Sequence, residues 1–212
     1  MLTNHLVIFV RAPEVGAVKR RLAWGRGGIG AVAACRFYRR NTAALLHRIG
    51  DDKRWRTRLA VSPDRAAETA GIWPEGLARL PQGPGDLGRR MARPLAALPP
   101  GPVAIVGSDI PDLDKPHIVA AFAALGSHDA VFGPAPDGGY WLAGLRRRPA
   151  LIAPFAGVRW STEHALADTL ANLPSTARVA LLERLTDIDT PEDYTAWRLA
   201  RRATAGRRGL RD

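Results

Sequence analysis

The feature that most constrains the fold is the alternation of short apolar runs with amphipathic stretches of helical length. Such alternation is typical of an α/β domain, in which helices cover a central sheet. The predicted strands are His5–Val10, Thr57–Ser62, Ala78–Pro81, Val103–Gly107, Asp129–Gly133, Tyr140–Leu145 and Arg178–Leu182. The predicted helices are Ile29–Ile49, Leu87–Leu98, Lys115–Leu125, Ser161–Leu173 and Pro191–Arg202.

One short connection indicates the kind of sheet. The segment GPAPDGGYWLAGL leaves no room for a helix between the fifth and sixth predicted strands. Because parallel neighbours need a long crossover, these two strands should be antiparallel. We therefore expect a three-layer α/β sandwich with a mixed, mostly parallel sheet. With 212 residues the chain can bury a full core, so we expect one domain over residues 1–202 and a basic tail over residues 203–212.

Composition limits the class of protein. The single cysteine, Cys35, excludes a disulfide framework. No apolar stretch approaches the roughly 20 residues that span a bilayer, and no secretory leader is visible, so we expect a soluble cytoplasmic protein without a membrane span. A net charge of +11 could serve nucleic acid, but arginines scattered along the chain supply nearly all of it. We interpret it as surface charge and expect no specific nucleic-acid partner.

The first candidate site follows the first predicted strand, in VIFVRAPEVGAVKRRLA. The strand runs into a loop with proline and glycine that ends at Lys19 and Arg21, where a helix can begin. Backbone N–H groups at such a turn face an anion, and the two cations add charge, so the segment predicts a phosphate site. Because the spacing is not that of a P-loop, a loop without a ligand stays an alternative.

A glycine-rich segment nearby, GRGGIG at residues 25–30, matches the letters of the dinucleotide-binding fingerprint. That fingerprint functions only directly after a strand, and VKRRLAW precedes it here. We interpret these glycines as a connection between two helices.

The fourth predicted strand ends in VGSDIPDL, which places Asp109 at its carboxyl end. In open α/β sheets ligands bind beyond these ends. A carboxylate there suits Mg²⁺ or Mn²⁺, which would neutralise a diphosphate. The alternative is a cap for the helix from Lys115, which Asp114 suits better by position. We assign the metal to Asp109 and a structural role to Asp112.

Two further acidic segments follow. GPAPDGGYWL places Asp137 before two glycines that allow close approach of the backbone to a ligand. In LTDIDTPEDY, Thr190 suits the N-cap of the last helix, which explains much of that cluster. Helix capping does not explain Asp187 and Asp189, which are therefore candidates for a second metal contact.

Six segments in order carry a family resemblance: VIFVRAPEVGAVKRRLA, PQGPGDLGRRM, VGSDIPDL, DAVFGPAPDGGYWLAGL, VRWST and LTDIDTPEDY. Together they resemble a bacterial family of predicted GT-A-type glycosyltransferases that is associated with arsenosugar biosynthesis. That family is similar in turn to the 2-phospholactate and molybdenum cofactor guanylyltransferases. The resemblance extends from about residue 6 to residue 195 and implies a nucleotide-diphospho-sugar transferase fold.

The resemblance also implies roles for individual residues. Those expected to contact the nucleotide or its phosphates are Arg11, Pro13, Gly16, Lys19, Arg21, Gln82, Gly85, Asp86 and Ser108. Those expected to contact the sugar or acceptor are Asp137, Gly138, Gly139 and Trp160, although a large aromatic such as Trp160 is more often part of a core. Asp109 and Asp189 would bind Mg²⁺ or Mn²⁺. The residues expected to be catalytic are Asp109, Lys19 and Asp137.

Two chemistries compete in such a site. We expect glycosyl transfer from a nucleotide sugar to a small acceptor. The alternative is nucleotidyl transfer from a nucleoside triphosphate to a phosphorylated small molecule, and the spacing between Asp109 and Asp112, unlike the D-x-D motif of many sugar transferases, favours it. A nucleotide-binding protein without catalysis is a third hypothesis, and the oligomeric state is left open.

Overall fold

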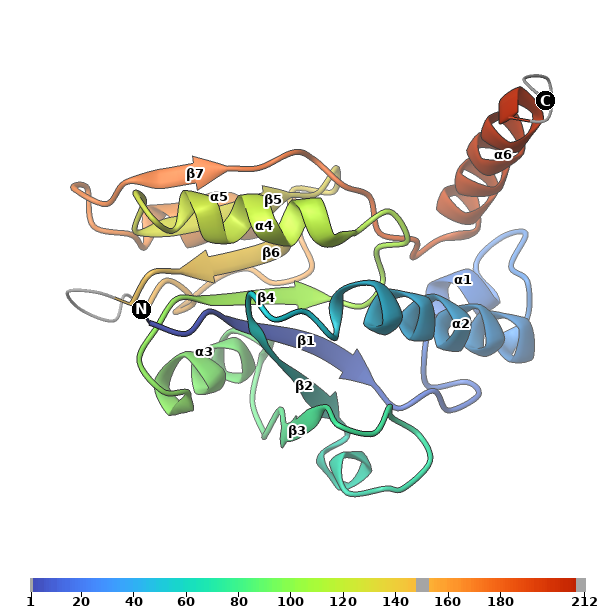
Figure 1. Cartoon of the computed structure of the whole chain (residues 1–212). Helices are drawn as coiled ribbons and strands as arrows, with labels where there is room; N and C mark the ends of the chain where they lie inside the picture. Colours follow the sequence, from blue (N-terminus) through green and yellow to red (C-terminus); the bar gives the residue numbers. More distant parts are fainter. Residues whose placement is uncertain (1, 148–152, 209–212) are drawn as a thin grey trace.

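The computed structural model describes residues 2–147 and 153–208, with side chains up to residue 203. Within these residues the chain forms a seven-stranded sheet covered by helices (Figure 1). The strands lie in the order β3-β2-β1-β4-β6-β5-β7. Their bounds are β1 His5–Arg11, β2 Arg56–Ser62, β3 Ala78–Pro81, β4 Val103–Gly107, β5 Ala130–Pro134, β6 Tyr140–Leu145 and β7 Val179–Leu181.

The sheet is mixed, as the sequence predicts. β1 pairs in parallel with β2 on one side and with β4 on the other. β6 is antiparallel to both β4 and β5, because the link of residues 135–139 is too short for a crossover. β7 pairs in parallel with β5 at the edge. The predicted fold class, a single-domain α/β structure with a mostly parallel sheet, is confirmed.

Helices cover both faces of the sheet. Leu6 and Ile8 of β1 pack in a core that includes residues of α2 and α4, whereas Val7 lies in a second core with residues of α3 and α5. Because successive side chains of a strand point to opposite faces, both cores need an apolar strand. The bounds of the helices are α1 Arg20–Trp24, α2 Ala31–Ile49, the 3₁₀ helix Asp64–Ala67, α3 Leu87–Ala97, α4 Lys115–Ala124, α5 Ala165–Ala171 and α6 Pro191–Arg208.

The predicted strands agree with the observed ones to within one residue at each end. The expected start of the fourth predicted helix at Ser161 is wrong, because Ser161 has a φ of 60°, a left-handed conformation that a right-handed helix cannot contain. The last helix continues to Arg208 instead of ending at Arg202, so it includes part of the expected tail. Residues 209–212 lie outside the described residues.

Two local predictions are confirmed. The glycine-rich segment 25–30 connects α1 to α2. Asp114 is the N-cap of α4, where its carboxylate accepts a hydrogen bond of 2.7 Å from the backbone N–H of Lys115. The side chain of Asp112 is exposed.

The topology creates one place for a ligand. In the sheet β1 lies between β2 and β4. The chain leaves β1 towards β2 and leaves β4 towards β5, on the other side, so the loops after β1 and β4 diverge. At such a switch point a crevice opens beyond the carboxyl ends of the strands. The loops that border it are residues 12–19 and 108–114.

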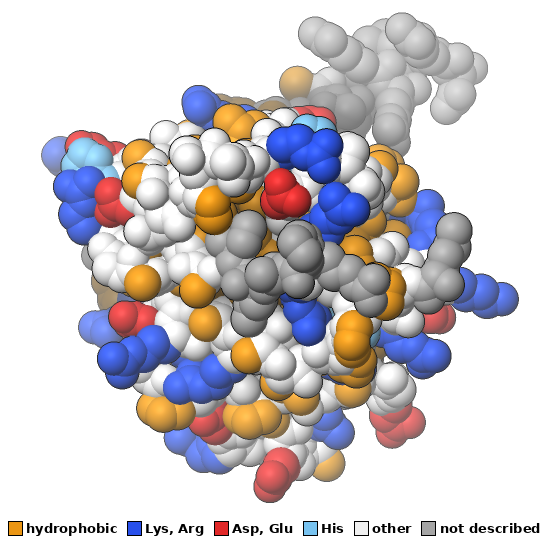
Figure 2. Space-filling model, turned by 90° about the vertical axis from the view of Figure 1, so that its left-hand side faces the viewer, with side chains coloured by type: hydrophobic (Ala, Val, Ile, Leu, Met, Phe, Trp, Pro, Cys, Tyr) orange, Lys and Arg blue, Asp and Glu red, His pale blue; other side chains and the backbone are white. Residues whose placement is uncertain are grey.

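Surface properties follow from the same structure. None of the described helices is both long enough and apolar enough to cross a membrane. Figure 2 shows the face at the amino ends of β1 and β4, where blue basic side chains lie scattered among acidic, apolar and other groups. On this face, therefore, the positive charge of the chain is not gathered into one patch.

Candidate functional site

Two cavities meet at Asp109, beyond the carboxyl ends of β1 and β4. We call the first the cationic cavity; it has a volume of about 500 Å³, and its charged lining residues are Arg11, Lys19, Arg20, Arg21, Arg90, Asp109 and Asp189. We call the second the aromatic cavity; it has a volume of about 270 Å³, and the residues that characterise it are Phe9, Met91, Tyr140, Trp141, Trp160, Asp109, Asp137 and Asp187. Four residues line both cavities, namely Phe9, Leu87, Gly107 and Asp109.

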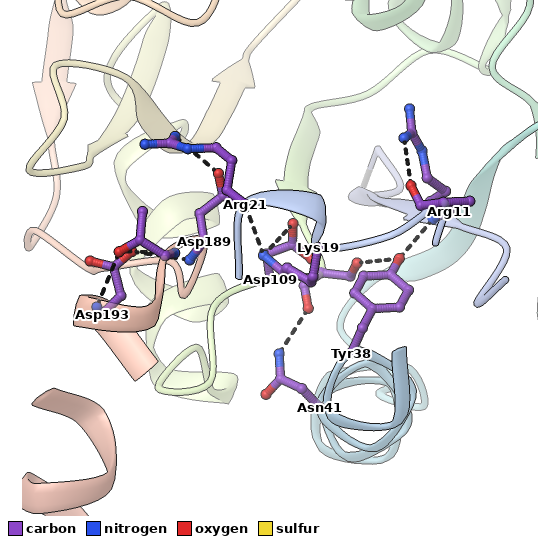
Figure 3. Close-up of polar contacts among 11 residues, drawn as sticks. Arg11, Lys19, Arg21, Tyr38, Asn41, Asp109, Asp189 and Asp193 are labelled. Atoms are coloured by element: carbon purple, nitrogen blue, oxygen red, sulfur yellow. Dashed lines mark hydrogen bonds and ion pairs between the residues drawn. The ribbon is translucent and has the colours of Figure 1, made fainter. Parts of the chain in front are cut away.

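Helix α2 holds the ends of β1 and β4 together below Asp109 (Figure 3). The hydroxyl oxygen of Tyr38 accepts a hydrogen bond of 2.8 Å from the backbone N–H of Arg11, and it lies 3.1 Å from the hydroxyl of Ser108. The amide of Asn41 donates a bond of 3.0 Å to the carbonyl of Ser108. Tyr38 and Asn41 stand three positions apart, on one face of the helix. This fixation of the backbone beside Asp109 was not predicted from the sequence.

Lys19 is the buried cation of the site. Its side chain is only 3% exposed, and its Nζ lies 3.0 Å from Oδ2 of Asp109 and 3.5 Å from Oδ1 of Asp189. Burial opposes the charge, but the two carboxylates outweigh burial and raise the pKa of Lys19. Arg21 also contacts Asp189, at 3.1 Å, although its side chain is 73% exposed. Both residues of the predicted phosphate cradle are thus paired with carboxylates.

The segment before α6 is fastened beside Asp109. The backbone N–H of Ile188 donates a hydrogen bond of 3.2 Å to the carbonyl of Asp109. Thr190 caps the helix, as predicted: its Oγ1 accepts from the backbone N–H of Asp193 at 3.2 Å, and the Asp193 carboxylate accepts from the N–H of Thr190 at 2.8 Å. These bonds place Asp189 near Lys19, far from it in sequence.

Four carboxylates surround this point, those of Asp109, Asp137, Asp187 and Asp189. The pKa of Asp187 is raised to about 6, chiefly by burial; Lys19 opposes this rise, and the other three carboxylates contribute to it. Oδ1 of Asp109 is buried and has no hydrogen-bond partner among the described residues. Carboxylate oxygens are the ligands that Mg²⁺ and Mn²⁺ prefer, so the chemistry of these residues fits a divalent cation.

The number of protein ligands is small. Across the part of the chain that the structure describes, no group of three or more histidine, cysteine, aspartate or glutamate side chains is arranged to hold a metal ion. Between Asp109 and Asp189 lies the ammonium group of Lys19. Mg²⁺ is commonly bound through one or two carboxylates together with substrate phosphates, so two ligands are sufficient for an ion that arrives with a nucleotide.

Arg90, in α3, is a cation of the cationic cavity that was not predicted from the sequence. The buried side chain of Gln82 donates to the carbonyls of Ala60, at 2.8 Å, and Val10, at 3.2 Å, and its Oε1 accepts from Nη1 of Arg90 at 2.9 Å. Burial and, next, the charge of Arg11 lower the pKa of Arg90, but a guanidinium stays protonated in proteins. Gln82 thus positions a second arginine at the cavity.

The aromatic cavity has a different wall. The rings of Tyr140 and Trp160 lie edge to face, with centroids 6.3 Å apart and planes at 72°. Asp137 stands at the rim, where its Oδ1 accepts a hydrogen bond of 2.9 Å from the backbone N–H of Gly139. Gly138 has a φ of 82° and lies so close to the backbone of Glu163 that no side chain would fit. Its conformation and packing, therefore, require glycine.

Most of the predicted site residues line one of the two cavities. In the cationic cavity lie Arg11, Lys19, Arg21, Gln82, Ser108, Asp109 and Asp189. In the aromatic cavity lie Asp109, Asp137, Gly139 and Trp160. The predicted residues that line neither cavity are Pro13, Gly16, Gly85, Asp86 and Gly138. Asp86 instead caps α3, accepting a bond of 2.8 Å from the backbone N–H of Arg89.

The fold is that of the nucleotide-diphospho-sugar transferases. A solved structure from Desulfovibrio desulfuricans, proposed to be such a transferase, is 27% identical and covers 90% of this chain and 84% of its own, with a TM-score of 0.78. The family model described as "Uncharacterized protein conserved in bacteria (DUF2064)" matches residues 45–162. This span is more than half of the chain, and the chain belongs to that family.

More distant structures share the fold alone. A 4-diphosphocytidyl-2C-methyl-D-erythritol synthase from Anaerococcus prevotii is 13% identical and covers 91% of this chain and 92% of its own, with a TM-score of 0.57. The Rv0371c protein of Mycobacterium tuberculosis, in complex with manganese, is 14% identical and covers 92% of this chain and 97% of its own, with a TM-score of 0.52. No curated protein matches the chain.

Proposed function

We propose that the chain is a metal-dependent transferase that transfers a glycosyl group from a nucleotide sugar to a small acceptor. The observation that supports this most is the meeting of the cationic and aromatic cavities at Asp109. A donor carries phosphates next to the group that is transferred, so it needs cations on one side of the reacting atoms and a second binding space on the other. The proposed GT-A type rests on the motifs in the sequence. The association of the resembling family with arsenosugar biosynthesis is not used to propose a substrate.

The charged residues of the cationic cavity would have different roles. The guanidinium groups of Arg11 and Arg90 would bind the diphosphate, because arginine presents a planar fork that matches phosphate oxygens. Asp109 and Asp189 would hold Mg²⁺ or Mn²⁺, which when bound would stabilise the negative charge of the leaving nucleotide. The ammonium of Lys19, buried between these carboxylates, would add positive charge beside the diphosphate.

The acceptor would lie in the aromatic cavity. There the carboxylate of Asp137, at the rim, would accept a hydrogen bond from an acceptor hydroxyl and take its proton. The side chain of Trp160 would pack against the acceptor molecule. The apolar side chains of the lining, among them Phe9 and Met91, would limit the access of water, which otherwise competes as the acceptor.

Nucleotidyl transfer is a second candidate. In its favour, five cationic side chains line the cationic cavity, which suits a triphosphate as well as a diphosphate. In that reaction an acceptor oxygen attacks the α-phosphorus of the nucleoside triphosphate, and pyrophosphate leaves.

Calorimetry with nucleoside triphosphates and nucleotide sugars, in Mg²⁺ and in EDTA, tests the proposal. Glycosyl transfer predicts tighter binding of a nucleotide sugar and release of a nucleoside diphosphate; nucleotidyl transfer predicts tighter binding of a triphosphate and release of pyrophosphate. Asp109→Asn should weaken the metal-dependent affinity at least about 30-fold, or ~2 kcal/mol. Asp112→Asn, an exposed residue of the same loop, is the matched control and should leave affinity unchanged. The absence of metal-dependent binding by both classes would refute a catalytic role.

A further inference from the structure

We infer that the second substrate of this transferase is an uncharged or cationic molecule with one apolar ring face, and not a phosphate ester. The inference rests on the proposed function and names the class of acceptor that the aromatic cavity accepts. It follows from the charge, the walls and the size of that cavity, three independent properties.

The charge of the aromatic cavity is negative. Three carboxylates line it, those of Asp109, Asp137 and Asp187, and the described lining residues include no lysine, arginine or histidine. Lys19 lines only the cationic cavity, on the far side of Asp109. A phosphate ester would therefore bring its negative charge next to Asp137 and Asp187 with no cation in the described lining to pair with it, since the ammonium of Lys19 is already shared by Asp109 and Asp189. Hydroxyl and ammonium groups, in contrast, can donate hydrogen bonds to the carboxylates.

A divalent ion would not reverse this preference. The carboxylates that would hold it are Asp109 and Asp189, and Asp189 lines only the cationic cavity. Asp137, in the β5–β6 link, lines only the aromatic cavity. Its charge, and that of Asp187 when ionised, would still face the acceptor while the ion neutralises the donor.

The walls favour a flat apolar face. Phe9, Met91 and the rings of Tyr140 and Trp160 line the cavity, and the two rings are held at 72° to one another. The pyranose ring of a sugar and the ring of an aromatic alcohol both present C–H groups that pack on such surfaces. The volume of about 270 Å³ lies below the range of roughly 300–1,000 Å³ for drug-sized ligands, so the cavity suits a single ring.

Matched pairs of probes test the inference. Glucose is compared with glucose 6-phosphate, glucosamine with glucosamine 6-phosphate, and benzyl alcohol with benzyl phosphate. The full chain, labelled with 5-fluorotryptophan and with the bound nucleotide and Mg²⁺, is observed by ¹⁹F NMR. The signal of Trp160 is identified by its loss in Trp160→Phe. At least one unphosphorylated probe should shift this signal and bind at least about tenfold more tightly than its phosphorylated partner, since like charges at a binding site are strongly unfavourable.

Charge variants sharpen the result. Asp137→Asn keeps the oxygen that accepts from Gly139 but removes one negative charge, so the ratio between the two members of a pair should fall about threefold or more. Asp112→Asn, outside both cavities, is the matched control and should leave the ratio unchanged.

Two outcomes would overturn the inference. One is a phosphorylated probe that binds more tightly than its unphosphorylated partner, and the other is a Trp160 signal that no probe shifts. Binding of the nucleotide itself is measured by calorimetry on the same sample. If the nucleotide does not bind, the proposed function fails; if it binds and a phosphate ester is preferred, only the acceptor class fails.

Discussion

The cationic and aromatic cavities share Asp109 and yet have opposite character. The first is built from the loop after β1 and from α3, and five basic side chains line it. The second is built from β6, from the β5–β6 link and from the segment before α5, and carboxylates and rings line it. One carboxylate at the end of β4 therefore separates two binding spaces of different chemistry.

This difference explains why net charge is a poor guide to the partner of the chain. The total of +11 describes the sum over the chain, whereas a ligand experiences only the groups that face it. In the aromatic cavity, the local balance among the described lining residues is negative.

Removal of the buried ammonium should have the largest effect. Lys19→Met keeps the apolar stem but leaves Asp109 and Asp189 without their shared cation. We expect a loss of about 2 kcal/mol of unfolding free energy in EDTA, less than for a fully buried ion pair, because the carboxylates of Asp109 and Asp189 are 39% and 36% exposed and solvent screens their charge. Urea denaturation measures it.

Mg²⁺ should restore more stability to Lys19→Met than to the wild type, since the ion can replace the missing positive charge. Arg21→Met is the control: its side chain is 73% exposed, so the change should stay within about 0.5 kcal/mol. Equal stability of Lys19→Met and the wild type would show that the ammonium does not stabilise this cluster.

The next largest effect concerns the cationic cavity. Arg90→Met should weaken binding of a nucleoside diphosphate about tenfold (~1.4 kcal/mol) and leave binding of the nucleoside unchanged, because the proposed ligand group of the guanidinium is the phosphate and not the nucleoside. Calorimetry measures both affinities. Arg89→Met is the matched control, an exposed arginine on the same helix that lines neither cavity. An equal loss for nucleoside and diphosphate would place Arg90 at the base instead.

A smaller effect is expected from Asp187, on the aromatic side. Its pKa is raised from the ordinary 3.8 to about 6. The folded state thus holds the proton more tightly than the unfolded chain, and stability should fall as the pH rises from about 4 to about 6. Asp187→Asn removes this cost and should be more stable than the wild type by about 1 kcal/mol at pH 7.

Urea denaturation at several pH values, in EDTA, measures this difference. The advantage of Asp187→Asn should shrink as the pH is lowered from about 6 to about 4, and it should be lost below the unfolded-state pKa of 3.8, where the wild-type carboxyl becomes protonated in both states. A difference in stability that does not change with pH would show that burial and the neighbouring carboxylates do not oppose ionisation of Asp187.

The smallest effect should come from the surface charge. We expect only weak, sequence-independent binding of oligonucleotides at physiological salt, with Kd no tighter than about 10⁻⁶ M, the tight end of non-specific binding. A gel-shift titration at about 0.15 M salt measures it. Tight binding that persists in EDTA would mean that the arginines outside the cavities form a nucleic-acid surface. The two cavities would then not determine the main partner of the chain.

Local sequence signals determined most of the fold and part of the site. Apolar runs bounded by turn residues were sufficient to place the strands, because a strand buried on both faces requires such a run. The position of Asp109 at the end of β4 followed from the same pattern, as did the caps by Asp114 and Thr190, which depend on neighbours within a few residues. These features are local, and a single sequence contains them.

Tertiary structure alone decided which charges meet. Lys19 and Asp189 are distant in the sequence and become partners only because the segment before α6 bonds to the backbone of Asp109. Arg90 reaches the cationic cavity because Gln82, buried between two strands, holds its guanidinium. No periodicity indicates such contacts, since they arise from the packing of elements that the chain joins by long connections, and the separation into two cavities of opposite character is a property of that packing.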